Sequence, residues 1–538
     1  MELSGRSIIG SRRAAGRGTT FNAVEPVTGQ ALPPAFASAS PDEIESAVTL
    51  AQEAFATYGH LPGRDKAAFL RSIAQGIESV TEELIERAGK ETALPKARLQ
   101  TETARTCGQL RLFAGLVAEG SWVNARIDNP EPDRKPIPKP GLRSMLRPLG
   151  PVVVFAPSNF PLAFSVAGGD TASALAAGNP VIVKAHGAHP GTSEIVGLVI
   201  RESARQCEIP EGVFSLLFGP GAEVGTALVK HPLVKAVGFT GSRAGGRALM
   251  DLAAARPEPI PVYTEMSSTN PVFILPGALR RNADAIAAGL YASFTLGAGQ
   301  FCTKPGMVFL PPDSSGDDFA SRLRTSVQES EPFTLLTASI HSTYCKETVQ
   351  RKSMPGVRVL AEKPVPGGPQ FNVGAALFET NASSFLHDPS LASEIFGPST
   401  LLVRDASRDQ LLQIARNLEG HLTATIHGTE DDLREFRDLV AILEDKVGRI
   451  IFNGFPTGVE VSHAIVHGGP YPATSDGRST SVGSNAIFRF TRLLCYQNFP
   501  ESALPPELKD ENPLRIRRMV DGEMTRSPIG QPLEAGVR

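Results

Sequence analysis

Cysteines and long apolar runs are scarce in this chain of 538 residues. The five cysteines are an odd number without CxxC or HxxxC spacing, so neither a disulfide framework nor a zinc site is indicated. No apolar run reaches bilayer length, because Pro157 and Pro161 divide the most apolar stretch, residues 151–169. The N-terminal segment lacks the apolar core of a signal peptide. The sequence therefore predicts a cytoplasmic protein with no membrane partner and no metal.

An excess of charge of one sign is also lacking. The 53 lysines and arginines nearly balance 56 aspartates and glutamates, for a net charge of −3. Such a chain offers no broad basic surface, which argues against general nucleic-acid binding. Hydrophobic residues make up 41% and charged residues 20%, which is ordinary for a globular protein with a large core. The partners we expect are small molecules or proteins.

Helical periodicity dominates the first part of the chain. Ser40 and Glu43 have the spacing of a capping box at the start of an apolar stripe. Helices are predicted at 41–58, about 65–90 and 93–120. The proline-rich segment 129–140 then predicts an extended arm.

From residue 150 onward, short β-branched runs alternate with helical stretches. The first runs lie at 152–156, 181–184, 213–218 and 236–240. This alternation is typical of a parallel sheet. A second series of strands is predicted at 271–275, 307–310, 401–403, 423–427 and 449–453. The pattern therefore predicts two α/β domains. Beyond residue 500 the chain is rich in proline and charge, which is typical of a tail that contacts another subunit or packs loosely.

A candidate nucleophile lies in the segment Gly-Ala-Gly-Gln-Phe-Cys, residues 297–302. Two glycines directly before the thiol allow a sharp turn that exposes the sulfur and the N–H of Cys302. Taken alone, the segment is more often explained by a structural cysteine beside a loop. Further residues are needed to favour catalysis.

Two such residues are Asn159 and Glu265. Asn159 follows a predicted buried strand, where α/β sheets place ligand-binding turns, and its amide can donate to an oxyanion. Glu265 precedes an apolar strand, where its carboxylate can activate water. The structural alternatives are an ordinary turn asparagine and an ion-paired glutamate.

Signals for a dinucleotide are individually weak. Two glycine-containing segments precede helices, but neither matches GxGxxG. Both place backbone N–H groups at helix starts, where phosphate binds favourably. The candidate residues are Gly221, Gly225, Thr240, Gly241 and Ser242.

Together these motifs resemble the aldehyde dehydrogenase superfamily over about residues 20–500. The order PSNFP (157–161), FTGS (239–242), Glu265, GQFC (299–302) and EIFGP (394–398) is the order of that family. The tracts 453–459, 467–474 and 495–500 look most like the branch of ketoglutarate-semialdehyde dehydrogenases and a bacterial fatty-aldehyde dehydrogenase. The resemblance implies an α/β fold with a Rossmann-type cofactor domain, an α/β catalytic domain and a small bridging oligomerisation element. The cofactor domain is expected at residues 1–128 and 151–268, and the catalytic domain at residues 269–484. The oligomerisation arm is expected at residues 129–150, and the arm and C-terminal tail also include residues 485–538.

The resemblance also implies residue roles. Cys302 would attack an aldehyde while Asn159 and the Cys302 N–H hold the oxyanion, and Glu265 would activate the water that hydrolyses the thioester. Glu394 and Phe396 match positions that hold the nicotinamide ribose and ring, and Lys184 matches the contact with the adenosine ribose.

One difference from the family bears on the cofactor. Relatives that prefer NAD typically carry a glutamate where this chain has Gly187. Without that carboxylate, Lys184 and His186 can face a 2′-phosphate. We therefore expect NADP, with NAD as the alternative.

The substrate side includes Arg105, Phe160 and, by resemblance, His467. A guanidinium at Arg105 suits a substrate with a distal carboxylate, such as 2-oxoglutarate semialdehyde, although a surface arginine is nearly as common an explanation. The alternatives are a medium- or long-chain aldehyde dehydrogenase, a CoA-acylating enzyme, which Glu265 disfavours, and a non-catalytic protein on a dehydrogenase scaffold. By resemblance, a homodimer or homotetramer is expected.

Overall fold

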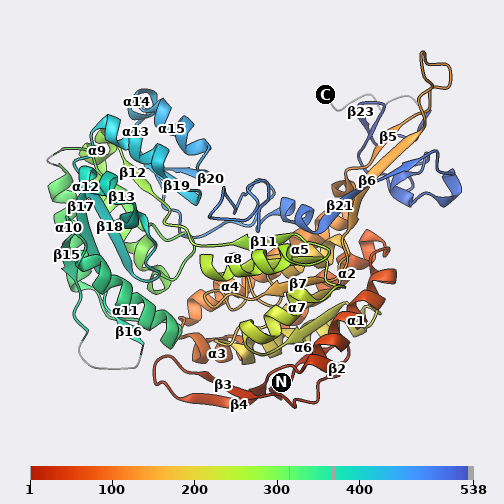
Figure 1. The fold of residues 1–538 in the computed structure, drawn as a ribbon, viewed down its shortest axis with the longest axis horizontal. Coiled ribbons are helices and arrows are strands. Elements are labelled where there is room, and N and C mark those ends of the chain that lie inside the picture. The colour runs from red at the N-terminus through yellow and green to blue at the C-terminus, as the bar shows by residue number, and fades with distance from the viewer. Residues whose placement is uncertain (1, 314, 366–370, 531–538) are drawn as a thin grey trace.

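The structure is a computed structural model that describes residues 2–313, 315–365 and 371–530. Figure 1 shows two lobes, each built on its own sheet, and a narrow arm that projects from one lobe. The predicted tail ends at residue 538, so residues 531–538 lie outside the described part.

The first lobe contains a seven-stranded sheet in the order β11-β10-β7-β8-β9-β1-β2. The five consecutive strands β11-β10-β7-β8-β9 are parallel, and they include the four predicted between residues 152 and 240. Parallel strands end at a common edge, so the residues that follow them meet there. The strands are β1 (Ile8–Ile9), β2 (Arg12–Arg13), β7 (Val152–Phe155), β8 (Val181–Lys184), β9 (Phe214–Leu217), β10 (Ala236–Thr240) and β11 (Val262–Glu265).

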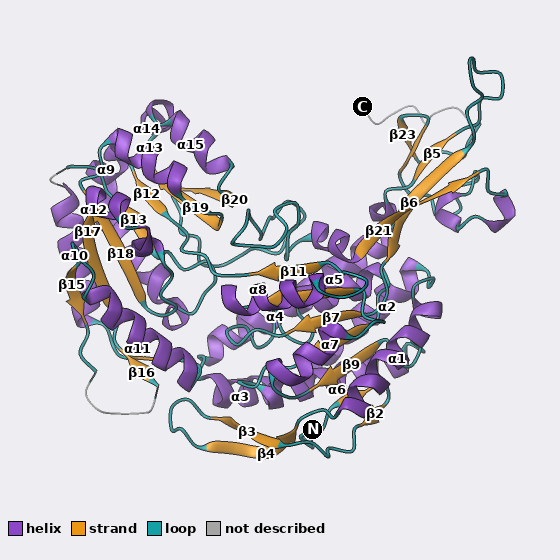
Figure 2. Ribbon diagram, in the orientation of Figure 1, coloured by secondary structure: helices purple, strands orange, loops and turns teal. Residues whose placement is uncertain are grey.

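Helices cover both faces of this sheet, as Figure 2 shows. The alternation of side chains along β7 divides them between two apolar cores: Val152 and Val154 lie in one, Val153 and Phe155 in the other. The helices are α1 (Pro41–Tyr58), α2 (Gly63–Ser79), α3 (Thr81–Thr92), α4 (Lys96–Glu119), α5 (Gly169–Ala177), α6 (Pro190–Gln206), α7 (Thr226–Lys230) and α8 (Arg243–Ala254).

The helix predicted over 41–58 is confirmed, including the reciprocal capping box of Ser40 and Glu43. The single helix predicted over 65–90 is wrong, because Val80 leaves helical geometry with φ −114° and ψ 15°. The hydroxyl of Thr81 donates to the carbonyl of Glu78 at 2.9 Å and so satisfies the end of α2. The break therefore separates α2 from α3.

The second lobe contains another seven-stranded sheet, in the order β15-β17-β18-β13-β12-β19-β20, with only β15 antiparallel. The strands are β12 (Val272–Ile274), β13 (Met307–Phe309), β15 (Arg358–Glu362), β17 (Ala376–Asn381), β18 (Ser399–Arg404), β19 (His421–His427) and β20 (Val447–Phe452). The helices are α9 (Pro276–Thr295), α10 (Ser315–Glu329), α11 (Ala338–Lys352), α12 (Ala382–His387), α13 (Arg408–Asn417), α14 (Glu430–Glu435) and α15 (Arg437–Glu444).

The arm is a five-stranded sheet in the order β21-β6-β5-β22-β23. Its strands are β5 (Arg126–Asp128), β6 (Leu142–Pro148), β21 (Thr491–Gln497), β22 (Arg518–Val520) and β23 (Glu523–Thr525). The described part of the tail is not loose: Leu504, Leu508 and Ile516 are buried in a core at the base of the arm. Two small hairpin-like pairs complete the structure, β3 (Thr20–Val24) with β4 (Ala31–Ala37), and β14 (Phe333–Thr334) with β16 (Asn372–Val373). The domain bounds expected from the sequence stay a prediction.

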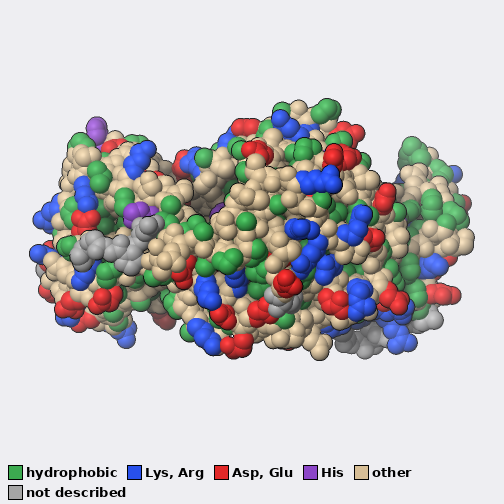
Figure 3. Space-filling model, turned by 90° about the horizontal axis from the view of Figure 1, so that it is seen from below, with side chains coloured by type: hydrophobic (Ala, Val, Ile, Leu, Met, Phe, Trp, Pro, Cys, Tyr) green, Lys and Arg blue, Asp and Glu red, His purple; other side chains and the backbone are tan. Residues whose placement is uncertain are grey.

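The surface carries charges of both signs. Basic and acidic side chains are interspersed over the face in Figure 3. None of the helices in the described part of the chain is both long and apolar enough to cross a membrane. The predicted cytoplasmic location stays a prediction.

Candidate active site

The turn before Cys302 is forced by glycine. After α9, residues 297–299 have φ values of 57°, 58° and 66°, in the left-handed region that favours glycine. A Cβ on Gly299 would lie 2.3 Å from the backbone of Gly397, so the two loops approach too closely for a side chain. The turn leaves Cys302 only partly buried, in the position expected of a reactive thiol.

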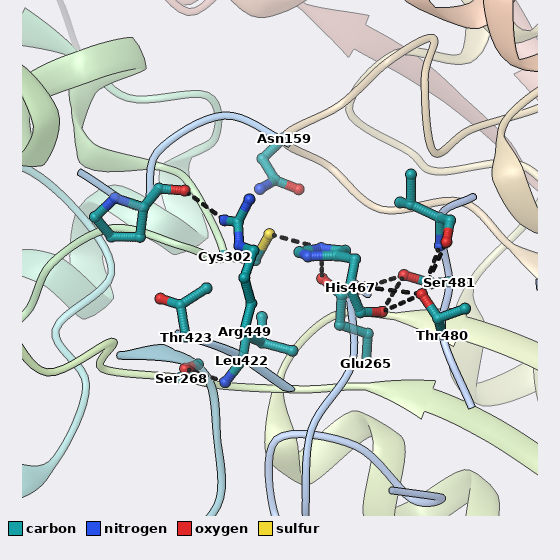
Figure 4. Close-up of polar contacts among 12 residues, drawn as sticks. Asn159, Glu265, Ser268, Cys302, Leu422, Thr423, Arg449, His467, Thr480 and Ser481 are labelled. Atoms are coloured by element: carbon teal, nitrogen blue, oxygen red, sulfur yellow. Dashed lines mark hydrogen bonds and ion pairs between the residues drawn. The ribbon is translucent and has the colours of Figure 1, made fainter. Parts of the chain in front are cut away.

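Cys302 belongs to a compact cluster with His467 and Glu265 (Figure 4). The Sγ atom lies 3.5 Å from Nε2 of His467, and the same Nε2 lies 2.9 Å from Oε1 of Glu265. Both His467 and Glu265 are buried. The sequence suggested His467 only as a substrate contact, whereas the structure places it between the thiol and the carboxylate.

Two hydroxyl groups fix this cluster from behind. The hydroxyl of Ser481 donates to Oε2 of Glu265 at 2.7 Å, and its oxygen lies 3.1 Å from the carbonyl of His467. Thr480 accepts the backbone N–H of His467 at 2.9 Å. Sequence reasoning missed both hydroxyls, because a serine or threonine in a polar loop carries no pattern that distinguishes it.

The pKa values of the thiol and the carboxylate are shifted in opposite directions. Burial and the Glu265 carboxylate raise the pKa of Cys302 well above its usual value, while Arg105 acts against this rise. Burial alone would raise the pKa of Glu265, but His467 and Ser481 stabilise the carboxylate, so its pKa is lowered. The resting state therefore pairs a protonated thiol with an ionised carboxylate.

The cluster also has the spacing of metal ligands. One ligand atom each from Glu265, Cys302 and His467 lies within 4.8 Å of the others. However, the guanidinium groups of Arg105 and Arg449 act electrostatically on the same thiol, and their charge opposes a cation there. The arrangement suits proton transfer better than metal binding.

Asn159 lies in the turn that follows β7, at the edge where the parallel strands end. It is buried, and its Nδ2 donates to the carbonyl of Gln300 at 2.9 Å. Because the amide nitrogen carries two hydrogens, one N–H is left for another acceptor. Figure 4 shows Asn159 above the thiol of Cys302. A neutral donor so close to a nucleophile is suited to an oxyanion.

The substrate side combines aromatic rings with arginine. Phe160 and Phe164 are buried against Phe301, and Arg105 on α4 stacks on two of these rings, 5.8 Å from the centroid of Phe160 and 5.0 Å from that of Phe164. Nε and Nη2 of Arg105 are buried without a hydrogen-bond partner. The structure thus brings the predicted Arg105 and Phe160 to the same side of Cys302 and leaves guanidinium donors unsatisfied.

The predicted ribose contacts lie at the end of β8, with Lys184 as its last residue and His186 and Gly187 just after it. Lys184 is buried, and burial lowers its pKa to about 8, with no charged neighbour among the causes of the shift. His186 is held neutral: its Nδ1 accepts the N–H of Ala188 at 3.1 Å, and burial lowers its pKa to about 3. A Cβ on Gly187 would lie 4.0 Å from the ring of Phe21, an ordinary van der Waals contact. Lys184 is therefore the member of the pair that offers charge to a phosphate.

The glycine-containing candidates lie at helix starts near this edge. Gly221 and Gly225 bound a π-helical turn before α7, and Ser242 caps α8 by accepting the N–H of Gly245 at 3.2 Å. A Cβ on Gly221 would meet nothing within 4 Å, whereas one on Gly241 would lie 2.6 Å from the ring of Phe239. Thr240 is the last residue of β10.

Glu394 and Phe396 lie on a loop that Lys304 holds in place. The buried ammonium of Lys304 donates to the carbonyls of Ile395 and Ser399, both at 2.8 Å. Burial raises the pKa of Glu394 to about 7, and Lys304 partly offsets this rise. Glu394 lines a cavity of about 510 Å³ together with Arg243 at the start of α8 and residues 267–269, which come directly after β11.

Comparisons with known proteins agree with this site. The family model described as the aldehyde dehydrogenase family matches residues 13–491. The chain is 49% identical over 524 residues to alpha-ketoglutaric semialdehyde dehydrogenase 2 of Azospirillum brasilense, covering 97% of this chain and all 100% of that protein. It is 43% identical over 527 residues to the alpha-ketoglutaric semialdehyde dehydrogenase of Acinetobacter baylyi, covering 98% and 100%, respectively.

The fold is likewise similar to solved structures. The NAD⁺ complex of an aldehyde dehydrogenase from Bacillus cereus matches with a TM-score of 0.79 and 20% identity, over 91% of this chain and 96% of that one. The predicted α/β fold class is thereby confirmed. The chain belongs to the aldehyde dehydrogenase family and is an enzyme that oxidises an aldehyde with a nicotinamide cofactor.

Proposed function

We propose that the enzyme oxidises 2-oxoglutarate semialdehyde to 2-oxoglutarate with NADP. The observation that carries this proposal is the unpaired guanidinium of Arg105 beside the cluster of Cys302, His467 and Glu265. An aldehyde held at the thiol with a carboxylate at its far end would satisfy that guanidinium. The printed names of the two relatives at 49% and 43% identity support the same substrate.

The cluster explains how the thiol becomes a nucleophile. Because the pKa of Cys302 is raised, its proton must leave for attack on the aldehyde carbon. Nε2 of His467 donates to the ionised Glu265 at 2.9 Å and so has no lone pair for this proton. The Glu265 carboxylate, which also interacts with the thiol, takes the proton and passes it to solvent before hydrolysis. The free N–H of Asn159 and the backbone N–H of Cys302 donate to the oxyanion of the thiohemiacetal.

The same carboxylate then serves hydrolysis. A bound nicotinamide dinucleotide supplies the hydride acceptor that converts the thiohemiacetal into a thioester. Glu265, ionised and oriented by Ser481, takes a proton from water, and the resulting hydroxide attacks the thioester carbon. The carboxylic acid leaves, and Cys302 is released as the thiolate.

The residues around β8 fit a phosphorylated dinucleotide. Lys184 is buried without a described carboxylate partner, and Gly187 lacks the side chain and the negative charge with which a glutamate would exclude a phosphate. Glu394 and Phe396 would hold the ribose and ring of the nicotinamide half, and Gly221, Gly225, Thr240, Gly241 and Ser242 would line the path of the phosphates. NADP is the preferred cofactor in this proposal.

We further infer that the enzyme is a homodimer or homotetramer that associates through the arm. The edge strand β21 leaves one side of its backbone without a partner strand among the described residues, and Leu493 on it is 69% exposed.

Replacement of Arg105 tests the substrate. In Arg105→Ala we expect kcat/KM for 2-oxoglutarate semialdehyde to fall by about 10- to 100-fold, because a charge-assisted hydrogen bond to the carboxylate is lost. The kcat/KM for pentanal, which has the same number of carbons and no carboxylate, should change by less than about threefold. Steady-state absorbance of the reduced cofactor measures both.

Arg111→Ala is the matched control, since Arg111 lies on the same helix but is exposed and paired with Glu78 at 2.6 Å. Equal losses on the two aldehydes in Arg105→Ala would remove the argument for a carboxylated substrate. A preference of the unchanged enzyme for long-chain aldehydes would favour the alternative function, a medium- or long-chain aldehyde dehydrogenase. The apolar side chains of Phe160, Phe164 and Phe301 would suit such a substrate.

A further inference from the structure

A second arginine approaches the thiol from the other lobe. Arg449 lies on β20, and burial lowers its pKa while the thiolate of Cys302 acts to raise it. Cys302 acts in the same sense on Arg105, which comes from α4. Two guanidinium groups, one on α4 and one on β20, therefore interact electrostatically with Cys302. Figure 4 shows the guanidinium of Arg449 beside Cys302 and below Asn159.

Arg449 is held in place by backbone carbonyls. Its Nη2 donates to the carbonyl of Pro456 at 2.9 Å, and Nη1 and Nη2 lie 3.4 Å from the carbonyl of Gly458. Its Nε is buried without an acceptor. These bonds orient the guanidinium but leave its positive charge uncompensated, because carbonyl oxygens carry no net charge.

No described carboxylate forms an ion pair with either arginine. Glu102 is the acidic group with the largest effect on Arg105, but it already pairs with Arg98 at 3.1 Å and accepts the N–H groups of residues 162 and 163 at 3.0 Å each. Among the described residues, the ionisable group whose charged form acts on Arg449 is Cys302, as the thiolate. Partly buried charges without a partner are unfavourable, and they concentrate at sites that bind an opposite charge.

We propose that Arg449 and Arg105 form an anion site flanking Cys302, which binds the carboxylate of the aldehyde substrate. The inference rests on the proposed function, since it names the second residue that recognises the same substrate class. An arginine on a strand is rigidly placed, and its planar fork suits a carboxylate better than a flexible lysine does. The alternative role for Arg449, a contact with the aldehyde oxygen alone, is separated by the test.

The test uses the reactivity of the thiol itself. Iodoacetate and iodoacetamide have similar size, and each transfers a carbon to the thiolate with loss of iodide, but only iodoacetate carries a carboxylate. We would measure both rates at Cys302 by peptide mass spectrometry, with no cofactor or substrate present. The exposed thiol of Cys345 and the partly exposed thiol of Cys207, both outside the arm, serve as internal references in the same chain.

We expect the ratio of iodoacetate to iodoacetamide rates to be about tenfold higher at Cys302 than at the reference thiols, because the anion is concentrated beside the sulfur. In Arg449→Gln, where the amide can still donate to the Pro456 carbonyl, the ratio at Cys302 should fall several-fold. Arg449→Lys keeps the positive charge, so it should retain most of the raised ratio at Cys302. A loss of thiolate affects both reagents equally, so the ratio isolates recognition of the anion.

Two results would overturn the proposal. One is that, in the unchanged enzyme, the ratio of iodoacetate to iodoacetamide rates is the same at Cys302 as at the reference thiols. The other is that this ratio at Cys302 does not change in Arg449→Gln. If Arg449→Gln does not fold, the rate ratio at Cys302 in the unchanged enzyme and in Arg105→Gln still tests the anion site. Arg324→Gln, at an exposed site on α10, is the control for loss of one positive charge. Failure to oxidise 2-oxoglutarate semialdehyde with the ratio intact would refute the proposed substrate and leave the anion site standing.

Discussion

At the scale of single residues, the proposed mechanism depends on a carboxylate, that of Glu265, whose two oxygens both have hydrogen-bond partners. Oε1 of Glu265 lies 2.9 Å from Nε2 of His467, and Oε2 accepts from Ser481 at 2.7 Å. The backbone N–H of Ser481 also donates to the carbonyl of His467 at 2.8 Å. A fully satisfied buried network of this kind is rigid and holds the carboxylate ionised. Ser481 thus positions both groups without touching the substrate.

Loss of that hydroxyl should change the pH dependence of the reaction. Ser481 stabilises the charged form of Glu265, so Ser481→Ala raises the pKa of the carboxylate. Since the base must be ionised, the acid limb of the kcat–pH profile should move to higher pH, by up to about one unit. Ser330→Ala, which removes a buried serine hydroxyl that donates to Val327 in the other lobe, is the control. An acid limb that stays in place, or moves to lower pH, would contradict the role of Ser481.

Sequence reasoning reached part of this site. Cys302, Glu265 and Asn159 were proposed because each stands in a local pattern that its chemistry requires: a glycine turn, a strand end and a ligand-facing turn. Ser481 and Arg449 could not be proposed from the sequence, because the orientations of their side chains depend on contacts between segments far apart in the chain. Arg449 lies within a strand of apolar residues, which is the only local sign of its function.

At the scale of elements, the thiol loop and the loop of Glu394 are joined by Lys304. Asn270 donates to the carbonyls of Cys302 at 2.8 Å and Lys304 at 3.0 Å, which fixes the turn after the thiol. From that turn the Lys304 ammonium reaches the carbonyls of Ile395 and Ser399. The nucleophile and the proposed nicotinamide contacts are therefore placed relative to one another by one buried side chain.

Lys304→Met should uncouple the two loops. The substitution leaves two buried carbonyls without a donor, each at a cost of about 1–3 kcal/mol. We expect the KM for NADP to rise about tenfold, because the Glu394 loop is no longer fixed, while alkylation of Cys302 by iodoacetamide changes by less than about threefold. Lys346→Met, an exposed lysine on α11, should change neither quantity. An unchanged KM in a folded Lys304→Met enzyme would refute this coupling.

Most elements could be predicted from periodicity, and the exceptions have physical reasons. The parallel strands are short, mostly apolar runs of three to seven residues bounded by turns, so most of them stand out in the sequence. The break at Val80 depends on a single residue within a continuous helical pattern. Strands β1 and β2 have two residues each and pair only because the N-terminus returns to the sheet edge, so no alternation marks them.

At the scale of the whole molecule, the arm is the surface best suited to a second copy of the chain. Figure 1 shows it standing clear of both lobes. Its edge strand β21 pairs with β6 on one side, and Leu493 on this strand is an exposed apolar side chain, as are Phe499 and Met524 in the same part of the molecule. An arm of this shape buries little of its own surface unless it packs against a partner.

Leu493→Glu should therefore weaken assembly. We expect the unchanged enzyme to sediment as a dimer or tetramer and the variant to sediment as a smaller species, because a buried unpaired carboxylate is unfavourable at an interface. Val349→Glu, at an equally exposed site on α11, should sediment like the unchanged enzyme. If the unchanged enzyme is a monomer, or Leu493→Glu assembles normally, the arm does not mediate association through this residue.

The central claim is that the whole chain converts 2-oxoglutarate semialdehyde to its acid with NADP. The most direct measurement incubates the unchanged enzyme with this aldehyde and NADP, then quantifies 2-oxoglutarate and the reduced cofactor, with NAD and pentanal as comparisons. The account predicts one equivalent of each product. It also predicts a higher kcat/KM with NADP than with NAD, and a higher kcat/KM for 2-oxoglutarate semialdehyde than for pentanal. Absence of turnover in the folded enzyme, or a preference for pentanal, would contradict it.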